Sequence, residues 1–144
     1  MQGFQADTTG YFALSDMGLL PSRFPGESSP LVVIECLQAG RPMIASALGE
    51  IPRMLATADG ETAGALIALD DGAIPVATLA DTISAFAAEP LRHAAARARV
   101  AGAARKFDPA AMRARYGEVY TAVTDAQAAP LRAAPRRGVA KAGA

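Results

Sequence analysis

The sequence predicts an α/β fold in which a parallel sheet is flanked by helices and the C-terminal third of the chain is helical. Short apolar runs alternate with helical segments in the first half, an order that implies parallel strands joined by right-handed crossovers. Helical spacing of apolar residues dominates from residue 76 onward. Hydrophobic residues make up 51% and charged residues 19% of the 144 residues, which suits one domain with a buried core. We therefore expect a Rossmann-like sheet with helices around it.

The first two elements are expected to be a short helix and a strand. Residues 8–15 show a short helical pattern with apolar side chains at Tyr11, Phe12 and Leu14. Residues 17–20 then form an uninterrupted apolar run. Such a run is typical of a strand that is covered on both faces.

A loop at residues 21–29 leads into an apolar helix predicted at residues 30–39. Ser28 or Ser29 is expected to cap this helix, because a side-chain hydroxyl can accept a hydrogen bond from the first-turn amides. Pro30 suits the first turn, where its missing N–H would have had no partner.

Two more strands follow, separated by a short helix and a turn. Strands are predicted at residues 43–46, where three apolar residues precede a serine, and at the apolar run of residues 65–69. Residues 51–57 are predicted as a brief helix, and the polar, glycine-containing residues 59–64 as a turn. Three short strands are few for a doubly wound domain, so the sequence predicts a partial one.

The remaining chain is predicted to be helical. The helix at residues 90–106 is rich in alanine and arginine and is expected on the surface. Asp108 followed by Pro109 marks the start of the last helix. The helix that begins at residue 76 is expected to have an apolar stripe of Val76, Leu79, Ile83 and Phe86. The stripe of the last helix is expected to comprise Met112, Tyr116, Val119, Tyr120 and Val123.

We predict a domain over residues 1–125 and a disordered tail over residues 126–144. The tail carries small residues, two prolines and four basic side chains without an acidic one. A weak contact with phosphate or lipid is the alternative to a disordered tail.

Composition narrows the function classes. Fourteen basic and fourteen acidic residues cancel, which argues against a nucleic-acid-binding surface. The single Cys36 and the single His93 argue against a dedicated zinc site, and we expect a buried apolar cysteine and a surface histidine. The sequence contains no run of about 18 apolar residues and no signal-peptide pattern, so a cytoplasmic protein is expected.

The helix at residues 30–39 has the features of an anion-binding element. Its N-terminal amides lack helical partners and lie at the positive end of the helix dipole, where a phosphate would be stabilised. Glu35 and Gln38 are its polar residues, three positions apart on one stripe. They could equally be the solvated edge of a packed helix, and Glu27 could be an ordinary loop carboxylate.

Residues 21–55, PSRFPGESSPLVVIECLQAGRPMIASALGEIPRML, resemble the donor-binding segment of the family 4, or group 1, retaining glycosyltransferases with the GT-B fold. The family's mark is two glutamates with seven residues between them, and Glu27 and Glu35 have this spacing. Pro21-Ser22, Ala39-Gly40, the apolar strand at residues 44–46 and the Gly-Glu-Ile-Pro turn continue the pattern. The resemblance extends over residues 11–123.

The resemblance implies a nucleotide-diphospho-sugar donor, with the sugar transferred with retention of anomeric configuration. Glu27 would be the catalytic residue near the transferred sugar, and Glu35 would bind the ribose hydroxyls. The diphosphate would lie against the helix start. The implied donor-binding residues are Ser28, Ser29, Pro30, Leu31, Val32 and Glu35.

No metal and no cofactor other than the nucleotide-sugar substrate is implied. The basic residues that neutralise the diphosphate in this family have no evident counterpart, and Arg23 and Arg53 are candidates by their nearness in sequence. We therefore expect the chain to be inactive alone and to depend on an N-terminal domain or a partner chain. The alternatives are a non-catalytic nucleotide- or phosphate-binding module and a partner-dependent subunit, and peripheral membrane association stays open.

Overall fold

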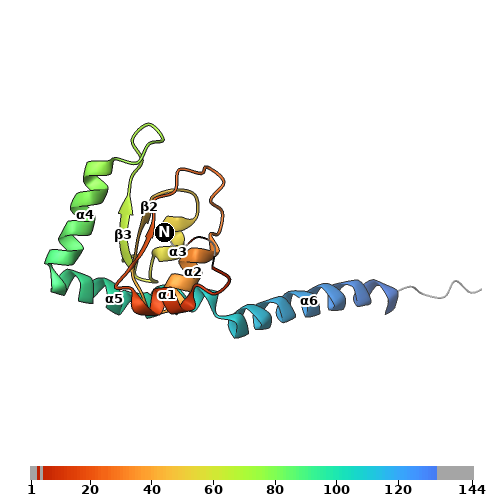
Figure 1. The fold of residues 1–144 in the computed structure, drawn as a ribbon. Coiled ribbons are helices and arrows are strands. Elements are labelled where there is room, and N and C mark those ends of the chain that lie inside the picture. Colours follow the sequence, from red (N-terminus) through yellow and green to blue (C-terminus); the bar gives the residue numbers. More distant parts are fainter. Residues whose placement is uncertain (1–2, 4, 133–144) are drawn as a thin grey trace, which may run out of the picture. The chain divides into compact units, whose positions relative to one another are not determined.

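The structure is a computed structural model that describes residue 3 and residues 5–132. It forms two compact units, Met1–Phe107 and Asp108–Ala144. Figure 1 shows the elements, which are α1 (Thr9–Leu14), β1 (Gly18–Leu20), α2 (Leu31–Gln38), β2 (Met43–Ser46), α3 (Ile51–Leu55), β3 (Gly64–Ile67), α4 (Val76–Ala88), α5 (Pro90–Ala104), a 3-10 turn (Arg105–Phe107) and α6 (Pro109–Arg132).

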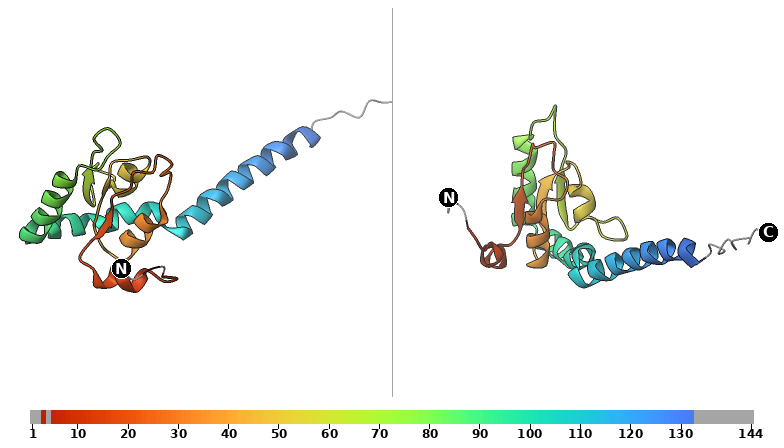
Figure 2. Two further views of the ribbon diagram at one scale, coloured as in Figure 1. Left: turned by 45° about the horizontal axis from the view of Figure 1, so that its top comes forward. Right: turned by 90° about the vertical axis from the view of Figure 1, so that its right-hand side faces the viewer.

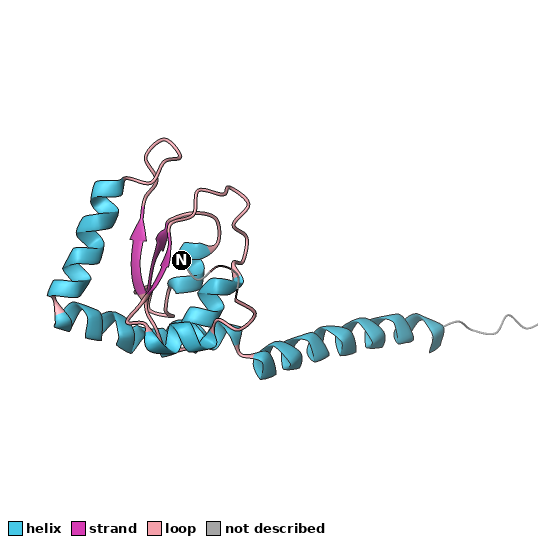
Figure 3. Ribbon diagram, in the orientation of Figure 1, coloured by secondary structure: helices cyan, strands magenta, loops and turns pink. Residues whose placement is uncertain are grey.

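The described part of the chain contains one sheet, and it is parallel. Its strands lie in the order β1-β2-β3, with Leu19 opposite Ile44 and Ile44 opposite Ala65. Helices join the strands in sequence, and Figure 3 shows the resulting alternation of helix and strand. The predicted α/β fold with a parallel sheet and flanking helices is therefore confirmed.

Helices cover both faces of this sheet. Helices α2 and α3 pack on one face, α4 contacts β3 on the other, and α5 runs beneath them, contacting α2, α3, α4 and β3 (Figures 1 and 2). The larger buried cluster lies on the α2 side and comprises Val33, Cys36, Leu37, Met43, Ala45, Ile51, Met54, Leu55, Ala63, Val100 and Ala103. The smaller cluster lies on the α4 side and comprises Ile44, Ile67, Phe86 and Ala96.

Strand β1 departs from the prediction that both of its faces are covered. Leu19 is 48% exposed, whereas Leu20 packs against the larger cluster. The reason is position in the sheet: β1 lies at an edge, while α4 packs over β3 at the opposite edge. An apolar run alone does not distinguish an edge strand from a central one.

Helix α5 was expected on the surface because alanine dominates it, and this expectation is wrong for one of its faces. Ala96, Val100 and Ala103 are buried. Small side chains allow the helix to approach its neighbours closely, so an alanine-rich face can be a packing face. The stripe predicted on α4 shows the converse, since Phe86 is buried but Val76 and Ile83 are exposed.

The second unit begins at Asp108. Its carboxylate Oδ1 accepts a 2.8 Å hydrogen bond from the amide of Ala110, which is the predicted cap of the last helix. Helix α6 continues to Arg132, beyond the boundary predicted at residue 125. Its apolar stripe is exposed along the described side chains, from Met112 to Val123. The part of the predicted tail at residues 133–144 lies outside the described residues.

Among the described residues, no helix combines the length and the apolar character needed to cross a membrane.

Candidate functional site

The loop at residues 21–30 joins the carboxyl end of β1 to the start of α2. In parallel α/β sheets, ligands bind beyond the carboxyl ends of the strands, so this loop occupies the position where a site is expected. The structure corrects the predicted cap. Pro30 is the residue at the N-cap, with φ −63° and ψ 119°, and no side chain caps the helix. The extended backbone of Pro30 turns the chain into the helix, and Ser28 and Ser29 lie exposed before it.

Glu27 is half-buried in this loop, and its side chain is held by a neighbouring hydroxyl. Ser22 Oγ donates a 2.6 Å hydrogen bond to Oε1 of Glu27. The Ser22 Oγ also accepts a 3.1 Å hydrogen bond from the amide of Phe24. The Glu27 amide in turn donates to the carbonyl of Phe24 at 3.3 Å. The loop is thus closed on itself around the carboxylate.

The backbone of Glu27 is held from the other side by the turn that follows β2. The amide of Glu50 donates a 3.1 Å hydrogen bond to the Glu27 carbonyl. Gly49 lies directly against this carbonyl: a Cβ at position 49 would lie 1.9 Å from the Glu27 oxygen, and its φ is +53°. Both the space and the backbone conformation therefore require glycine there.

Glu35 lies one turn into α2 on its exposed face, together with Leu31 and Gln38. The exposed face of this helix is not only polar, since Leu31 in its first turn is 69% exposed. The Glu35 carboxylate has a partner from a distant segment: Thr8 Oγ1 donates a 2.8 Å hydrogen bond to its Oε2. Thr8 is the residue before α1, and α1 contacts α2.

The start of α2 provides backbone donors. The amide of Val33 bonds the carbonyl of Pro30 at 3.0 Å, which is a tight first turn. The amides of Leu31 and Val32 precede it, at the two positions whose N–H groups have no acceptor within the helix. Leu31 is exposed and Val32 half-buried, so the helix start faces outward beside the Glu27 loop.

Basic groups near the loop are few in the described structure. Arg53 Nε lies 3.1 Å from Glu50 Oε2, so the turn that holds Glu27 also carries an exposed ion pair. Arg23 is exposed within the loop itself. Arg41 is directed elsewhere, since its guanidinium donates to the carbonyl of Ala13.

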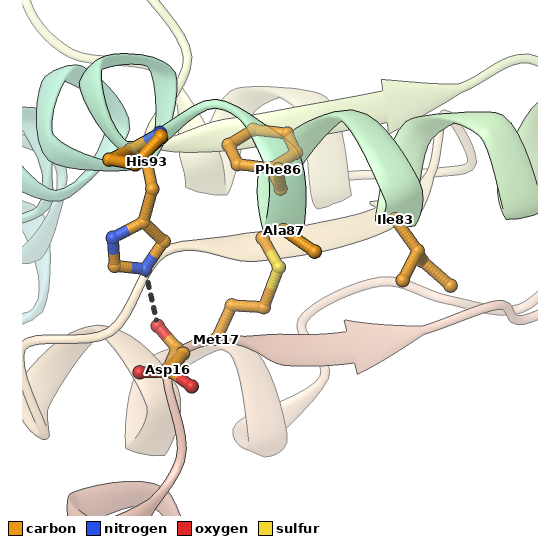
Figure 4. Close-up of a pocket in the computed structure, with 7 residues that line it drawn as sticks. Asp16, Met17, Ile83, Phe86, Ala87 and His93 are labelled. Carbon is orange, nitrogen blue, oxygen red and sulfur yellow. Dashed lines mark hydrogen bonds between the residues drawn. The ribbon is translucent and has the colours of Figure 1, made fainter.

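Cys36 and His93 lie away from this loop, as structural residues. Cys36 is buried in α2, and burial raises the pKa of its thiol to about 11, so the thiol is neutral at physiological pH. His93 Nε2 lies 2.9 Å from the carbonyl of Asp16 (Figure 4). No group of three potential metal-ligating side chains occurs within the described residues.

The apolar pocket drawn in Figure 4 has a volume of about 410 Å³ and lies between the start of β1 and helices α4 and α5. Met17, Ile83 and Phe86 give it a largely apolar wall. Because Met17 precedes β1 and the Glu27 loop follows it, the pocket and the loop lie at opposite ends of this strand. The pocket is therefore separate from the predicted site.

The structure places Glu27 in the loop before α2 and Glu35 one turn inside the helix, and it gives each its own partner, Ser22 for Glu27 and Thr8 for Glu35. No hydrogen bond joins the two carboxylates in the described structure. Sequence reasoning missed both hydroxyls as site residues. Ser22 stood in the Pro21-Ser22 pattern, which was the available signal, whereas Thr8 lies 27 residues from its partner and no local pattern indicated it.

Fold and site together define an α/β domain with a carboxylate-bearing loop and a helix start at the carboxyl end of a parallel sheet. A family model described as glycosyl transferases group 1 matches residues 1–89. This match covers more than half of the chain and includes the three strands, the Glu27 loop and α2. The chain therefore belongs to the group 1 glycosyl transferases. Comparisons with curated proteins and with solved structures gave no match.

Proposed function

We propose that this chain is the donor-binding part of a retaining glycosyltransferase of the GT-B, family 4 type, whose donor is a nucleotide-diphospho-sugar. The observation that carries the proposal is the placement of Glu27 and Glu35 around the start of α2, in a chain of the group 1 family. One glutamate precedes the helix and the other lies one turn inside it. A ligand lying along the helix start would therefore meet a carboxylate at each end.

In this proposal, Glu27 accepts hydrogen bonds from hydroxyls of the transferred sugar. Its carboxylate is half-buried and already accepts one hydroxyl, that of Ser22. A carboxylate offers about four lone-pair positions. Capacity for a ligand hydroxyl therefore remains, and a fixed carboxylate would recognise the sugar with little loss of side-chain freedom.

The diphosphate is proposed to lie against Leu31 and Val32. The amides at these positions are the first two of α2 and have no acceptor within the helix. Hydrogen bonds from them, together with the helix dipole, would stabilise the negative charge that develops on the leaving diphosphate. Pro30 contributes no donor, and Ser28 and Ser29 would border the phosphates from the loop.

Glu35 is proposed to accept hydrogen bonds from the ribose hydroxyls. Its position on the exposed face of α2, one turn beyond Leu31, suits contact with the sugar next to the diphosphate. A carboxylate that binds a vicinal diol through both oxygens distinguishes a ribose from a deoxyribose.

Transfer by this chain alone is not expected. The described basic groups near the loop are the exposed Arg23 and Arg53, and Arg53 is engaged with Glu50. Neutralising a diphosphate would need further cations, so we propose that basic groups and an acceptor-binding domain come from another polypeptide segment. A turnover assay with labelled sugar donors and mixed acceptors checks this, and clear transfer by the purified chain would contradict it.

Calorimetry tests the donor site directly. We expect the chain to bind at least one of UDP, GDP and ADP, and we expect Glu35→Ala to weaken that binding about tenfold, because a hydrogen-bonded charged acceptor is lost. Asp81→Ala is the control: it removes one exposed carboxylate from α4 and should leave affinity unchanged. Equal affinity of Glu35→Ala and the unchanged protein would refute the ribose contact.

A further inference from the structure

The Ser22 hydroxyl forms two hydrogen bonds in the loop, one as an acceptor and one as a donor. Its oxygen accepts the amide hydrogen of Phe24 at 3.1 Å, so its own hydrogen is free to point to Oε1 of Glu27, 2.6 Å away. A hydroxyl–carboxylate bond at this distance is charge-assisted and stronger than a neutral hydrogen bond. We propose that Ser22 is a positioning residue, which fixes the Glu27 carboxylate for the sugar of the donor. This inference rests on the function proposed above.

The loop is arranged so that the Ser22 hydrogen bond orients the carboxylate instead of merely closing a turn. The turn already has its own backbone closure, the 3.3 Å bond from the Glu27 amide to the Phe24 carbonyl. The ring of Phe24 also packs where Gly26 has no side chain, since a Cβ there would lie 2.6 Å from the ring. The serine hydroxyl therefore adds an orientation to a turn that other contacts close.

The opposite side of Glu27 is fixed independently. The Glu50 amide bonds the Glu27 carbonyl at 3.1 Å, and Gly49 lies against the same carbonyl. The turn holds the main chain of Glu27, and Ser22 holds its carboxylate. We therefore infer that Ser22 controls the rotation of the Glu27 side chain. Loss of the hydroxyl should therefore release the carboxylate without moving the backbone of Glu27.

If Ser22 positions Glu27, its loss should change the binding of the sugar, which a purely structural role of Ser22 would not predict. Glu27 is proposed to contact the sugar and not the nucleotide, so a released carboxylate should weaken binding of the nucleotide sugar and spare binding of the nucleoside diphosphate. Preorganised groups lose less entropy on binding, and their release commonly lowers affinity about tenfold. The ratio of the two affinities is thus the specific readout.

Calorimetry with UDP-glucose and UDP, GDP-mannose and GDP, and ADP-glucose and ADP tests this on the full chain. For the pair that binds, Ser22→Ala should reduce the affinity for the nucleotide sugar about tenfold and change that for the diphosphate less than about twofold. Ser22→Thr keeps the hydroxyl and should restore the ratio. Ser15→Ala is the matched control, because it removes a serine hydroxyl that bonds the Phe12 carbonyl at 3.0 Å in α1.

A measurement without ligand separates this inference from the proposed function. In Ser22→Ala, the side-chain carboxyl carbon of Glu27 and the amide of Phe24 should shift in NMR spectra, while the Glu50 amide stays in place. Unchanged resonances of Glu27 would overturn the positioning role even if nucleotides bind. Equal losses of sugar and diphosphate affinity would overturn it as well. If the unchanged protein binds none of the six compounds, the proposed function fails, and the positioning role for a sugar fails with it.

Discussion

Thr8 donates a 2.8 Å hydrogen bond to Oε2 of Glu35 across 27 residues of sequence. The bond links the segment before α1 to the exposed face of α2. It also engages one of the two oxygens that a ribose diol would use in the proposed site. Thr8 fills one of the two lone-pair positions of that oxygen, so a bound ribose would compete with Thr8 only for this position.

Removing this hydroxyl should therefore strengthen nucleotide binding. We expect Thr8→Val, which keeps the shape of the side chain, to raise the affinity for the bound nucleoside diphosphate about two- to fivefold, because an exposed neutral donor is modest in strength. Calorimetry measures the change. Thr82→Val is the control, since it removes a hydroxyl that bonds the Thr78 carbonyl at 2.7 Å in α4. Weaker binding by Thr8→Val would mean that Thr8 orients Glu35 instead of competing for it.

Gly49→Ala should disturb the loop through the backbone of Glu27. The new Cβ would lie 1.9 Å from the Glu27 carbonyl, and alanine would have to adopt a φ of +53°. We expect a stability loss of roughly 1–3 kcal/mol and displacement of the loop. Chemical denaturation gives the first quantity, and the NMR shifts of Glu27 and Glu50 give the second. A fully stable variant with unchanged shifts would contradict the contact.

Gly64→Ala provides a comparison in the sheet. Its φ is +141°, and a Cβ there would lie 1.8 Å from the Met43 carbonyl on the neighbouring strand. Because β3 and β2 pair at this point, the variant should lose more stability than Gly49→Ala, and circular dichroism should show a lower unfolding temperature. The two variants separate damage to the core from damage to the loop. The same unfolding temperature for both would count against this distinction.

Stability should fall at alkaline pH through Cys36. Burial raises the pKa of its thiol from 9.0 to about 11, so the folded state holds the proton more tightly than the unfolded state does. The stabilisation of the folded state by the protonated Cys36 thiol is fully present below pH 9 and is lost as the pH rises to about 11. Denaturant unfolding at about pH 8 and about pH 11 measures it, and Cys36→Ala should lose less stability between the two conditions.

Lys106 has the opposite effect on stability at alkaline pH. Burial lowers the pKa of its ammonium from 10.5, with the charge of Arg53 adding to the effect. The unfolded state therefore binds more protons just below pH 10.5, and the contribution of Lys106 to stability rises with pH. Lys106→Met removes this opposing contribution, so its alkaline loss of stability should be steeper. A shallower loss would show that the sign is wrong.

The start of α6 can be tested by itself. Asp108 Oδ1 bonds the Ala110 amide at 2.8 Å, and loss of such a cap costs about 1 kcal/mol of helix stability. We expect Asp108→Ala to reduce the helical signal in circular dichroism, whereas Asp108→Asn should retain it. An undiminished signal in Asp108→Ala would contradict the cap.

Much of the fold followed from local pattern. The strand at residues 43–46 was predicted with the bounds that the structure has, because three consecutive apolar residues precede Ser46, and all four positions are buried. Exposure of Leu19 and burial of the alanine face of α5 were missed. Both depend on which element lies next to which in space, and no spacing along the chain carries that information.

The candidate site divides in the same way. Glu27 and Glu35 were predicted as site residues because their spacing resembles the pattern of the family, and the start of α2 was predicted from its local helix signals. Their hydroxyl partners were not, since Ser22 reaches Glu27 through a folded loop and Thr8 reaches Glu35 only after α1 packs on α2. The roles assigned to the two glutamates stay predictions that the binding experiments above decide.

The hydrogen bond from the Glu50 amide to the Glu27 carbonyl gives the site a built-in reporter. Glu50 lies after β2 and outside the loop that follows β1, so we expect its amide proton to exchange with solvent only when the two segments separate. A bound nucleotide sugar that orders the Glu27 loop should slow hydrogen exchange at the Glu50 amide. Site occupancy can thus be monitored at one backbone amide, in a titration that needs neither catalysis nor a labelled sugar.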